Sequence, residues 1–140
     1  MNKTDLLGLT ELLNQWDDLP KKMTFDDVFK KVTKIKQTNI KTAIFIAEMD
    51  SKIVGYAFLT EVCFLGIDNF IELQSILVSK PHRGIGIGKL LLAHSETWTK
   101  ENGYKKIMLS SRVQLENAHM FYTSQGYGIS KQSYFFAKEI

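Results

Sequence analysis

The chain is poor in the residues that build metal sites and disulfide frameworks, with three histidines and one cysteine among 140 residues. A single cysteine, Cys63, cannot form an intramolecular disulfide, so it predicts a reducing, cytoplasmic compartment. The histidines and the cysteine show no metal-ligand spacing, so no metal is expected. No apolar run approaches the length that spans a bilayer, and no signal-peptide pattern begins the chain, so no membrane association is expected.

The overall composition is that of an ordinary globular protein, with 44% hydrophobic and 24% charged residues. This balance excludes a disordered, collagen-like or coiled-coil chain as the main state. A chain of 140 residues is long enough to bury its own core, and no linker or repeat interrupts it. Residues 1–140 are therefore predicted to form a single domain.

The net charge of +3 is unevenly distributed along the chain. Residues 1–70 hold nine Lys against ten Asp and Glu, whereas residues 71–140 hold nine Lys and Arg against five Asp and Glu. This modest excess, without an interleaved stripe of basic and aromatic residues, argues against a nucleic-acid partner. A local cluster suits an anionic ligand, although a solubility bias would also explain it. The cluster comprises Lys80, His82, Arg83 and Lys89.

Hydrophobic periodicity predicts helices and strands in one mixed order. The first helix ends before Pro20, and Thr24 with Asp27 resembles the capping box that begins a second helix. Later helices are expected from Ile87 to a left-handed cap at Asn102-Gly103, and over 116–124. The predicted strands are 42–48, 53–65, 70–79, 106–110 and 134–137. This order indicates an α+β fold in which helices flank a mixed, mostly antiparallel sheet.

The segment from Val78 to Leu90 carries the strongest chemical signal, because a strand runs into a glycine-rich turn that opens a helix. Glycines at 84, 86 and 88 let the backbone approach a ligand closely. The helix N-terminus adds unpaired N–H groups and the positive end of a dipole. Together these features predict a phosphate-binding cradle, and Arg83 can add a charge-assisted contact.

Three kinds of phosphate loop compete for this segment. A Walker A loop requires glycine six residues before its lysine and Ser or Thr after it, and here those places hold Arg83 and Leu90. A Rossmann fingerprint fails because its third glycine would fall on Lys89. The acyl-coenzyme-A loop, Q/R-x-x-G-x-G/A, is matched by Arg83, Gly86 and Gly88.

A second motif follows this loop at residues 118–127. It has Ala118, Tyr122 and Gly126 at spacings of four, followed by Tyr127. With the glycine loop and Leu77-Val78 before it, the chain resembles the GNAT family of N-acetyltransferases over residues 42–140. The resemblance implies the GNAT, or acyl-CoA N-acyltransferase, fold and acetyl-CoA as the acyl donor.

The resemblance assigns cofactor-binding roles to two stretches of the chain. The strand end at Leu77 and Val78 would grip the pantetheine arm through its backbone, and the helix carrying Tyr122 would contribute to the same site. The loop and first helical turn would hold the pyrophosphate through Arg83, Gly84, Ile85, Gly86, Ile87, Gly88 and Lys89. One departure is Leu115, which stands where the family commonly has asparagine.

Acetyl transfer from a thioester to an amine needs a base for the ammonium, a donor to the carbonyl oxygen and a proton for the departing thiolate. The resemblance implies the backbone N–H of Val78 for the carbonyl and Tyr122 for the thiolate. The resemblance implies Glu72 as the base, since its place six residues before Val78 matches the base glutamate of the family's protein-acetylating branch. Even spacing also places it on the face of Val78, although a solvent-exposed charge on an edge strand explains it as well. Alternative bases acting through water are Glu61 and Asp68.

The predicted function is an N-acetyltransferase that moves the acetyl group of acetyl-CoA to a primary amine on a small molecule or peptide. The alternative is a non-catalytic acyl-CoA-binding or sensor module on the same fold. The resemblance places Trp16, Asp17 and Asp18 where the family shapes its acceptor pocket, although a solvated helix end explains the acidic pair as well. A homodimer is compatible with the resemblance, and Cys63 in its apolar run is expected to be a core residue.

Overall fold

A computed structural model describes residues 1–17 and 19–140, so Asp18 lies outside the described residues. The chain divides into two units, Met1–Ser110 and Ser111–Ile140, and each is described by itself. The first unit holds the sheet and its flanking helices, and the second begins with one helix.

Two capped helices open the first unit. Helix α1 (Lys3–Leu13) begins at Asn2, whose side chain and that of Asp5 form a capping box. Helix α2 (Phe25–Lys36) begins at Thr24, where Thr24 and Asp27 form the predicted capping box. Each box satisfies N–H groups that the first helical turn leaves without partners, so the sequence signal at Thr24 is confirmed.

The sheet has the order β1-β2-β3-β4. Strands β1 (Thr42–Met49), β2 (Lys52–Phe64) and β3 (Ile67–Val78) are antiparallel to one another, and β4 (Ile107–Leu109) runs parallel to β3. A tight turn at Asp50 and Ser51, both with positive φ, joins β1 to β2. The mixed, mostly antiparallel sheet of an α+β fold is therefore confirmed.

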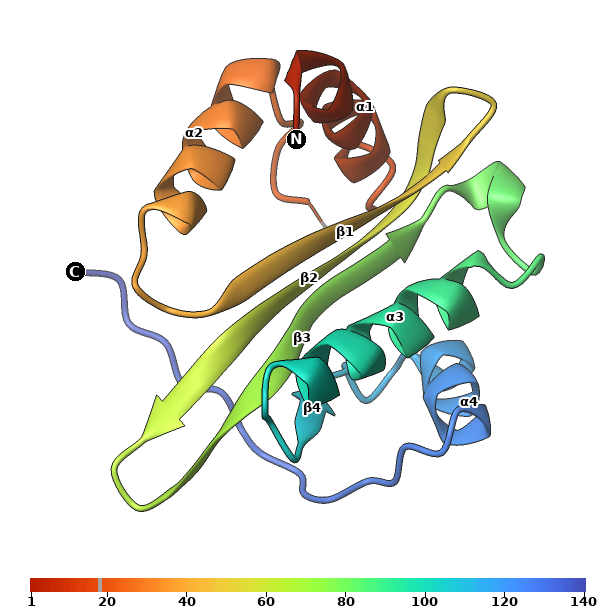
Figure 1. The fold of residues 1–140 in the computed structure, drawn as a ribbon. Coiled ribbons are helices and arrows are strands. Elements are labelled where there is room, and N and C mark those ends of the chain that lie inside the picture. The colour runs from red at the N-terminus through yellow and green to blue at the C-terminus, as the bar shows by residue number, and fades with distance from the viewer. Residues whose placement is uncertain (18) are drawn as a thin grey trace. The chain divides into compact units, whose positions relative to one another are not determined.

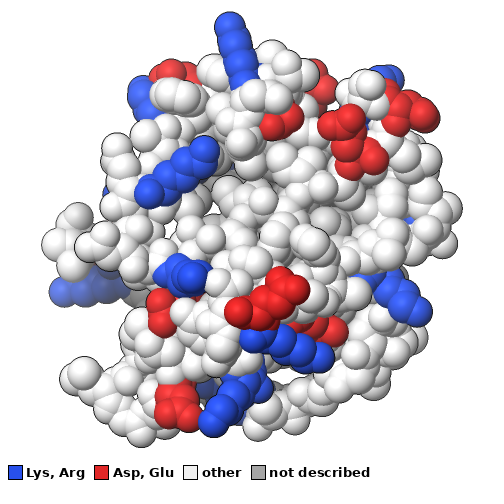
Figure 2. All heavy atoms as spheres, viewed as in Figure 1, with Lys and Arg blue, Asp and Glu red and all other residues white. Residues whose placement is uncertain are grey.

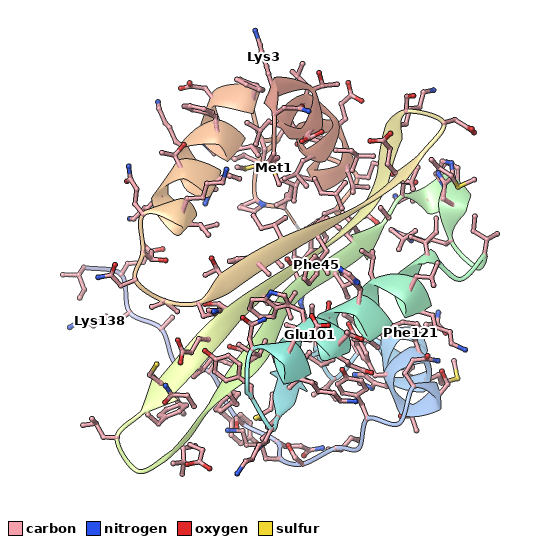
Figure 3. All side chains as sticks on the ribbon, in the orientation of Figure 1. Met1, Lys3, Phe45, Glu101, Phe121 and Lys138 are labelled. Carbon is pink, nitrogen blue, oxygen red and sulfur yellow. The ribbon has the colours of Figure 1, made fainter. Side chains whose placement is uncertain are left out.

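Helices cover both faces of the sheet in the first unit (Figure 1). Helices α1 and α2 pack on one face, and α3 (Ile87–Glu101) packs on the other. On the α3 face, the ring of Phe45 from β1 meets His94 and Trp98 edge-on at centroid distances of 4.5 and 6.2 Å (Figure 3). The core on the α1 and α2 face comprises Leu6, Leu9, Leu12, Val28, Val32 and Tyr56.

Strand β3 contains a β-bulge that the sequence pattern did not predict. Phe58 on β2 pairs with Ser75, and the next residue pairs with Leu73, so Gln74 is an extra residue in β3. A bulge reverses the alternation of side chains between the two faces. Glu72 therefore shares the α1 and α2 face with Leu77, whereas Val78 lies on the α3 face. The expectation that Glu72 and Val78 share a face was wrong.

The second unit begins with helix α4 (Glu116–Ser124), which has the predicted bounds. The strand predicted over 134–137 is wrong, because the structure assigns neither helix nor strand to residues 128–140. Tyr134, Phe135 and Phe136 are each about nine-tenths exposed or more. Aromatic residues tolerate a strand, but a strand exists only where a neighbour pairs its backbone N–H and C=O groups.

One further expectation about burial was wrong. Cys63 was expected in the core, and it lies exposed near the end of β2. Slight desolvation of the thiol and the nearby Glu61 carboxylate raise the pKa of Cys63, which keeps the thiol protonated at neutral pH. Within the described part of the chain, each helix is too short or too polar to cross a bilayer.

Candidate functional site

The site is built from the end of β3, where the sheet opens. The N–H of Ser79 donates to the carbonyl of Val54 at 2.8 Å, which makes Gly55 and Val78 a pair without mutual hydrogen bonds. The N–H groups of Val78 and, two residues earlier, Ile76 therefore point away from β2. Strand β4 pairs with β3 only at Ile71 to Leu73. Both N–H groups lie on the edge of β3 that faces β4, past the residues that pair with β4. A carbonyl group of a ligand could accept hydrogen bonds from them there.

The predicted role of Val78 is thus compatible with the geometry, and the same N–H direction makes Ile76 a second candidate donor. Sequence analysis missed Ile76 because the direction of a backbone N–H depends on strand register. The direction of the Ile76 N–H follows from the register in which β2 pairs with β3. The sequence of an apolar strand does not specify that register to the exact residue.

The turn after β3 leaves the space that a phosphate cradle requires. A short 3₁₀ turn at Lys80–His82 leads into glycines 84 and 86, which have φ values of +80° and +93°. A Cβ atom at either glycine would meet nothing within 4 Å, so the protein leaves the space beside both backbones open. Non-glycine residues rarely adopt such φ values, which explains glycine at these positions.

Helix α3 begins at Gly86 and directs its N-terminus to this open space. The N–H of Leu90 bonds the carbonyl of Gly86 at 3.0 Å, so the earlier N–H groups of the helix have no partner within it. Gly55 on β2 lets the helix lie close to the sheet, because a Cβ there would lie 3.1–3.2 Å from Leu91, Ile87 and the carbonyl of Leu77. A glycine cradle at a helix N-terminus fits a pyrophosphate group.

Charged side chains surround the turn. The Nε of Arg83 donates to the carbonyl of Val78 at 3.0 Å, which ties the turn to the strand end. Lys80 joins the turn to the segment after α1, since its Nζ lies 2.9 Å from Asp17 Oδ1 and its N–H donates to Gln15 at 3.2 Å. The hydrogen bond and charge of Lys80 lower the pKa of Asp17. Elsewhere Lys and Arg are interspersed with Asp and Glu on the face drawn in Figure 2.

The candidate base Glu72 is half-buried on β3, and its Oε2 accepts a hydrogen bond from Gln74 at 2.8 Å. Along an extended strand, six residues from Glu72 to Val78 correspond to roughly 20 Å. Ile76 is four residues away, or roughly 13 Å. The Glu72 carboxylate therefore lies too far from either N–H group to contact a molecule bound there without an intervening water, and the N–H of Ile76 lies nearer to it than that of Val78.

The two alternative bases are less suited by their surroundings. Glu61 accepts hydrogen bonds from Asn69 at 2.8 Å and from the N–H of Lys41 at 3.4 Å. The bond from Asn69 is the main cause that lowers the pKa of Glu61, which makes it a weaker base. Asp68 is exposed ten residues before Val78, roughly 33 Å along the strand.

Helix α4 in the second unit carries Tyr122. Burial raises the pKa of the Tyr122 hydroxyl above its ordinary value of 10.0. Its ring contacts Phe121 at a centroid distance of 5.3 Å and Tyr127 at 6.1 Å. A hydroxyl that stays protonated at neutral pH is suited to donate a proton rather than to accept one.

The departure at Leu115 has a local structural consequence. Leu115 occupies the N-cap position of α4 and provides no side-chain hydrogen bond there, whereas asparagine is among the preferred N-caps. Instead, the N–H of Leu115 donates to the carbonyl of Arg112 at 3.0 Å, and His119 Nε2 lies 2.9 Å from the same carbonyl. His119 therefore fixes the segment that leads into α4 by its contact with the Arg112 carbonyl, a role that the sequence did not predict.

The structure brings together the residues of the first unit that were predicted to bind the cofactor. Strand end, turn and helix N-terminus are contiguous from Leu77 to Lys89. Tyr122 belongs to the second unit and is described only with its neighbours there. Among the described residues, no group of three or more His, Cys, Asp or Glu could hold a metal ion.

Comparisons with known proteins agree with this architecture. The chain is 34% identical over 68 residues to the uncharacterized N-acetyltransferase YhdJ of Bacillus subtilis, covering 49% of this chain and 47% of that protein. It is 35% identical over 91 residues to the aminoalkylphosphonate N-acetyltransferase of Salmonella typhimurium, covering 64% of this chain and 57% of that protein. The matches thus span about half the length of these curated relatives.

A solved structure with a similar fold is the aminoglycoside N-acetyltransferase AAC(6')-Iy in complex with CoA. It has a TM-score of 0.82 and 23% sequence identity, covering 100% of this chain and 92% of that one. A model of the acetyltransferase (GNAT) family matches residues 9–127, a range that runs across both units. The chain belongs to the acetyltransferase (GNAT) family.

Proposed function

We propose that this protein is an acetyl-CoA-dependent N-acetyltransferase. The observation that carries the proposal is the open glycine cradle at the N-terminus of α3, directly after a strand end whose N–H groups point away from β2. One end of this arrangement suits a pyrophosphate, and the other suits the amide and thioester carbonyls of an acyl-CoA. We also propose a cytoplasmic location, for which the support is the single cysteine.

The acceptor is a primary amine on a small molecule. Support comes from the relatives, one of which acts on aminoalkylphosphonates by its name, and from the structural similarity to an aminoglycoside N-acetyltransferase. These two substrate classes differ in charge, so they define the first compounds to test. A peptide amine is an alternative acceptor, and the lysine peptide in the same assay tests it.

The proposed reaction is a direct attack of the amine nitrogen on the thioester carbonyl. Glu72 receives a proton from the ammonium through water, which gives the nitrogen a lone pair. The N–H of Ile76 or Val78 donates to the carbonyl oxygen as negative charge develops on it. As the C–S bond breaks, the Tyr122 hydroxyl donates a proton to the thiolate. The nitrogen loses its second proton as the amide forms, and this proton restores the Tyr122 hydroxyl through water. An acetylated amine and CoA are then released.

The test is to incubate the protein with acetyl-CoA and a panel of amines and to measure free thiol. The panel contains an aminoalkylphosphonate, an aminoglycoside, a polyamine and a lysine peptide. We expect thiol release that depends on one class of amine, with mass spectrometry showing a gain of one acetyl group. Acetyl-CoA binding by calorimetry without turnover of any amine would favour a sensor module, and absence of binding would contradict the proposal.

Replacing Glu72 with glutamine should slow turnover by about 100-fold near neutral pH, the scale of general base catalysis. The amide can still contact Gln74, so the substitution removes the proton acceptor with little change in packing. At high pH the amine loses its proton unaided, and the difference between variant and wild type should shrink. The measurement is kcat as a function of pH, with Glu61→Gln as the matched control. An unchanged profile in Glu72→Gln would exclude Glu72 as the base.

A further inference from the structure

The turn after β3 contains a side-chain pair that the proposed mechanism does not use. Ser79 is only 4% exposed, and its Oγ lies 2.6 Å from Nδ1 of the half-buried His82. The N–H of His82 also donates to the carbonyl of Ser79 at 2.9 Å. The two residues are thus joined by one side-chain and one backbone hydrogen bond.

This pair lies between the two parts of the candidate cofactor site, the end of β3 and the glycine turn. Ser79 directly follows Val78, whose carbonyl accepts the hydrogen bond from Arg83 at 3.0 Å. His82 directly precedes Arg83, and the N–H of Ser79 is anchored to Val54 on β2 at 2.8 Å. The chain from Val78 to Arg83 is therefore closed on itself and attached to the sheet at its first residues.

We propose that Ser79 and His82 are positioning residues, which hold Arg83 and the glycine turn in the geometry that binds the pyrophosphate of acetyl-CoA. The inference rests on the proposed function and adds two residues to it. The burial of Ser79 supports positioning rather than nucleophilic attack, because a nucleophile must be reached by its substrate. One hydrogen bond can form between the two side chains in either protonation state of His82.

The physical reason for such a pair lies in the next residues of the turn. Gly84 and Gly86 have wide backbone freedom, and fixing them upon ligand binding costs conformational entropy. A turn that is already closed at Ser79 and His82 loses less entropy when the ligand binds. The pair should therefore affect the affinity for the cofactor more than the chemical step.

The first measurement is the Kd for CoA of Ser79→Ala by calorimetry. A hydrogen bond worth about 1 kcal/mol corresponds to roughly a fivefold rise in Kd. The matched control is Ser95→Ala on α3, since Ser95 is fully buried and its Oγ donates to the Leu91 carbonyl at 2.7 Å. We expect Ser95→Ala to lower the melting temperature and to leave Kd within twofold of wild type.

A double-mutant cycle then separates positioning from direct contact with the phosphates. If the residues act as a pair, Ser79→Ala with His82→Ala should bind CoA no more weakly than either single variant. Compared with His82→Ala, His82→Asn keeps a polar atom in the position of Nδ1, so its affinity for CoA should be close to that of the wild type. In steady-state assays, Ser79→Ala should raise KM for acetyl-CoA by the same factor and leave kcat nearly unchanged.

The outcomes distinguish the two proposals. If wild-type protein binds CoA and Ser79→Ala behaves like Ser95→Ala, the positioning role is overturned and the proposed function stands. If His82→Ala weakens binding further in the Ser79→Ala background, His82 contacts the ligand as an independent cation, which also overturns the pair. If wild-type protein does not bind CoA, both proposals fail.

Discussion

Replacing Gly86 with aspartate should abolish binding of acetyl-CoA while the fold is retained. Gly86 is the N-cap of α3 and has a φ of +93°, and a Cβ there would project into open space. The new carboxylate would occupy the proposed place of the pyrophosphate and repel it. Losing charge-assisted contacts worth about 3 kcal/mol corresponds to a loss in affinity of about 100-fold or more, measurable by calorimetry.

The control for this substitution is at the other end of the same helix. Gly103 has a φ of +83° and equally open surroundings, so Gly103→Asp introduces similar backbone strain and the same charge away from the turn. Gly103→Asp should bind acetyl-CoA normally, and it should lower the melting temperature at least as much as Gly86→Asp does, because a carboxylate is unfavourable at the C-terminus of a helix and favourable at its N-terminus. Gly86→Ala isolates the strain of about 1–2 kcal/mol from the charge and should bind with intermediate affinity. An unchanged Kd in Gly86→Asp would contradict the cradle assignment.

The parts of the structure that the sequence predicted are those set by near neighbours. The capping box of Thr24 and Asp27 is complete within one helical turn, so its residues mark the start of α2 without further context. The same holds for Gly103, whose positive φ follows the last turn of α3. The turn at Gly84 and Gly86 could be predicted for the same reason, since glycine is the residue that adopts a positive φ without strain.

The parts that could not be predicted depend on pairing between distant segments. The bulge at Gln74 arises from the register of β2 against β3, and no residue near it signals an extra position. That single residue moves Glu72 to the face opposite Val78. The strand predicted at 134–137 was wrong for a similar reason. Its aromatic residues are favourable in a strand, but they do not show that a neighbouring strand is there to pair with them.

The candidate site was predicted in part for the same reasons. Spacing made Arg83 and Tyr122 candidates, since motifs preserve distances along the chain, and their roles stay predictions. Spacing did not identify the N–H of Ile76, whose direction follows from hydrogen-bond register, or the contact between Ser79 and His82. A serine three residues before a histidine is an ordinary sequence, and only the fold of the turn places their side chains 2.6 Å apart.

Replacing Tyr122 with phenylalanine should lower turnover by about 10²–10⁴-fold, the scale expected when a general acid is lost. Phenylalanine keeps the ring that contacts Phe121 and Tyr127 and removes only the hydroxyl. Affinity for acetyl-CoA and the melting temperature should therefore barely change. Single-turnover kinetics are the appropriate measurement, because slow product release would mask the chemical step.

The pH dependence of the wild-type enzyme provides an independent check on Tyr122. A general acid must be protonated, so its contribution is present below its pKa and lost as pH rises through it. Burial raises the pKa of Tyr122 above the ordinary value of 10.0, so single-turnover rates should show no loss from this group below about pH 10. Tyr127→Phe, which removes a hydroxyl from a neighbouring ring, should leave the rate within a few-fold of wild type. Lower stability of Tyr122→Phe with turnover intact would instead make Tyr122 a packing residue.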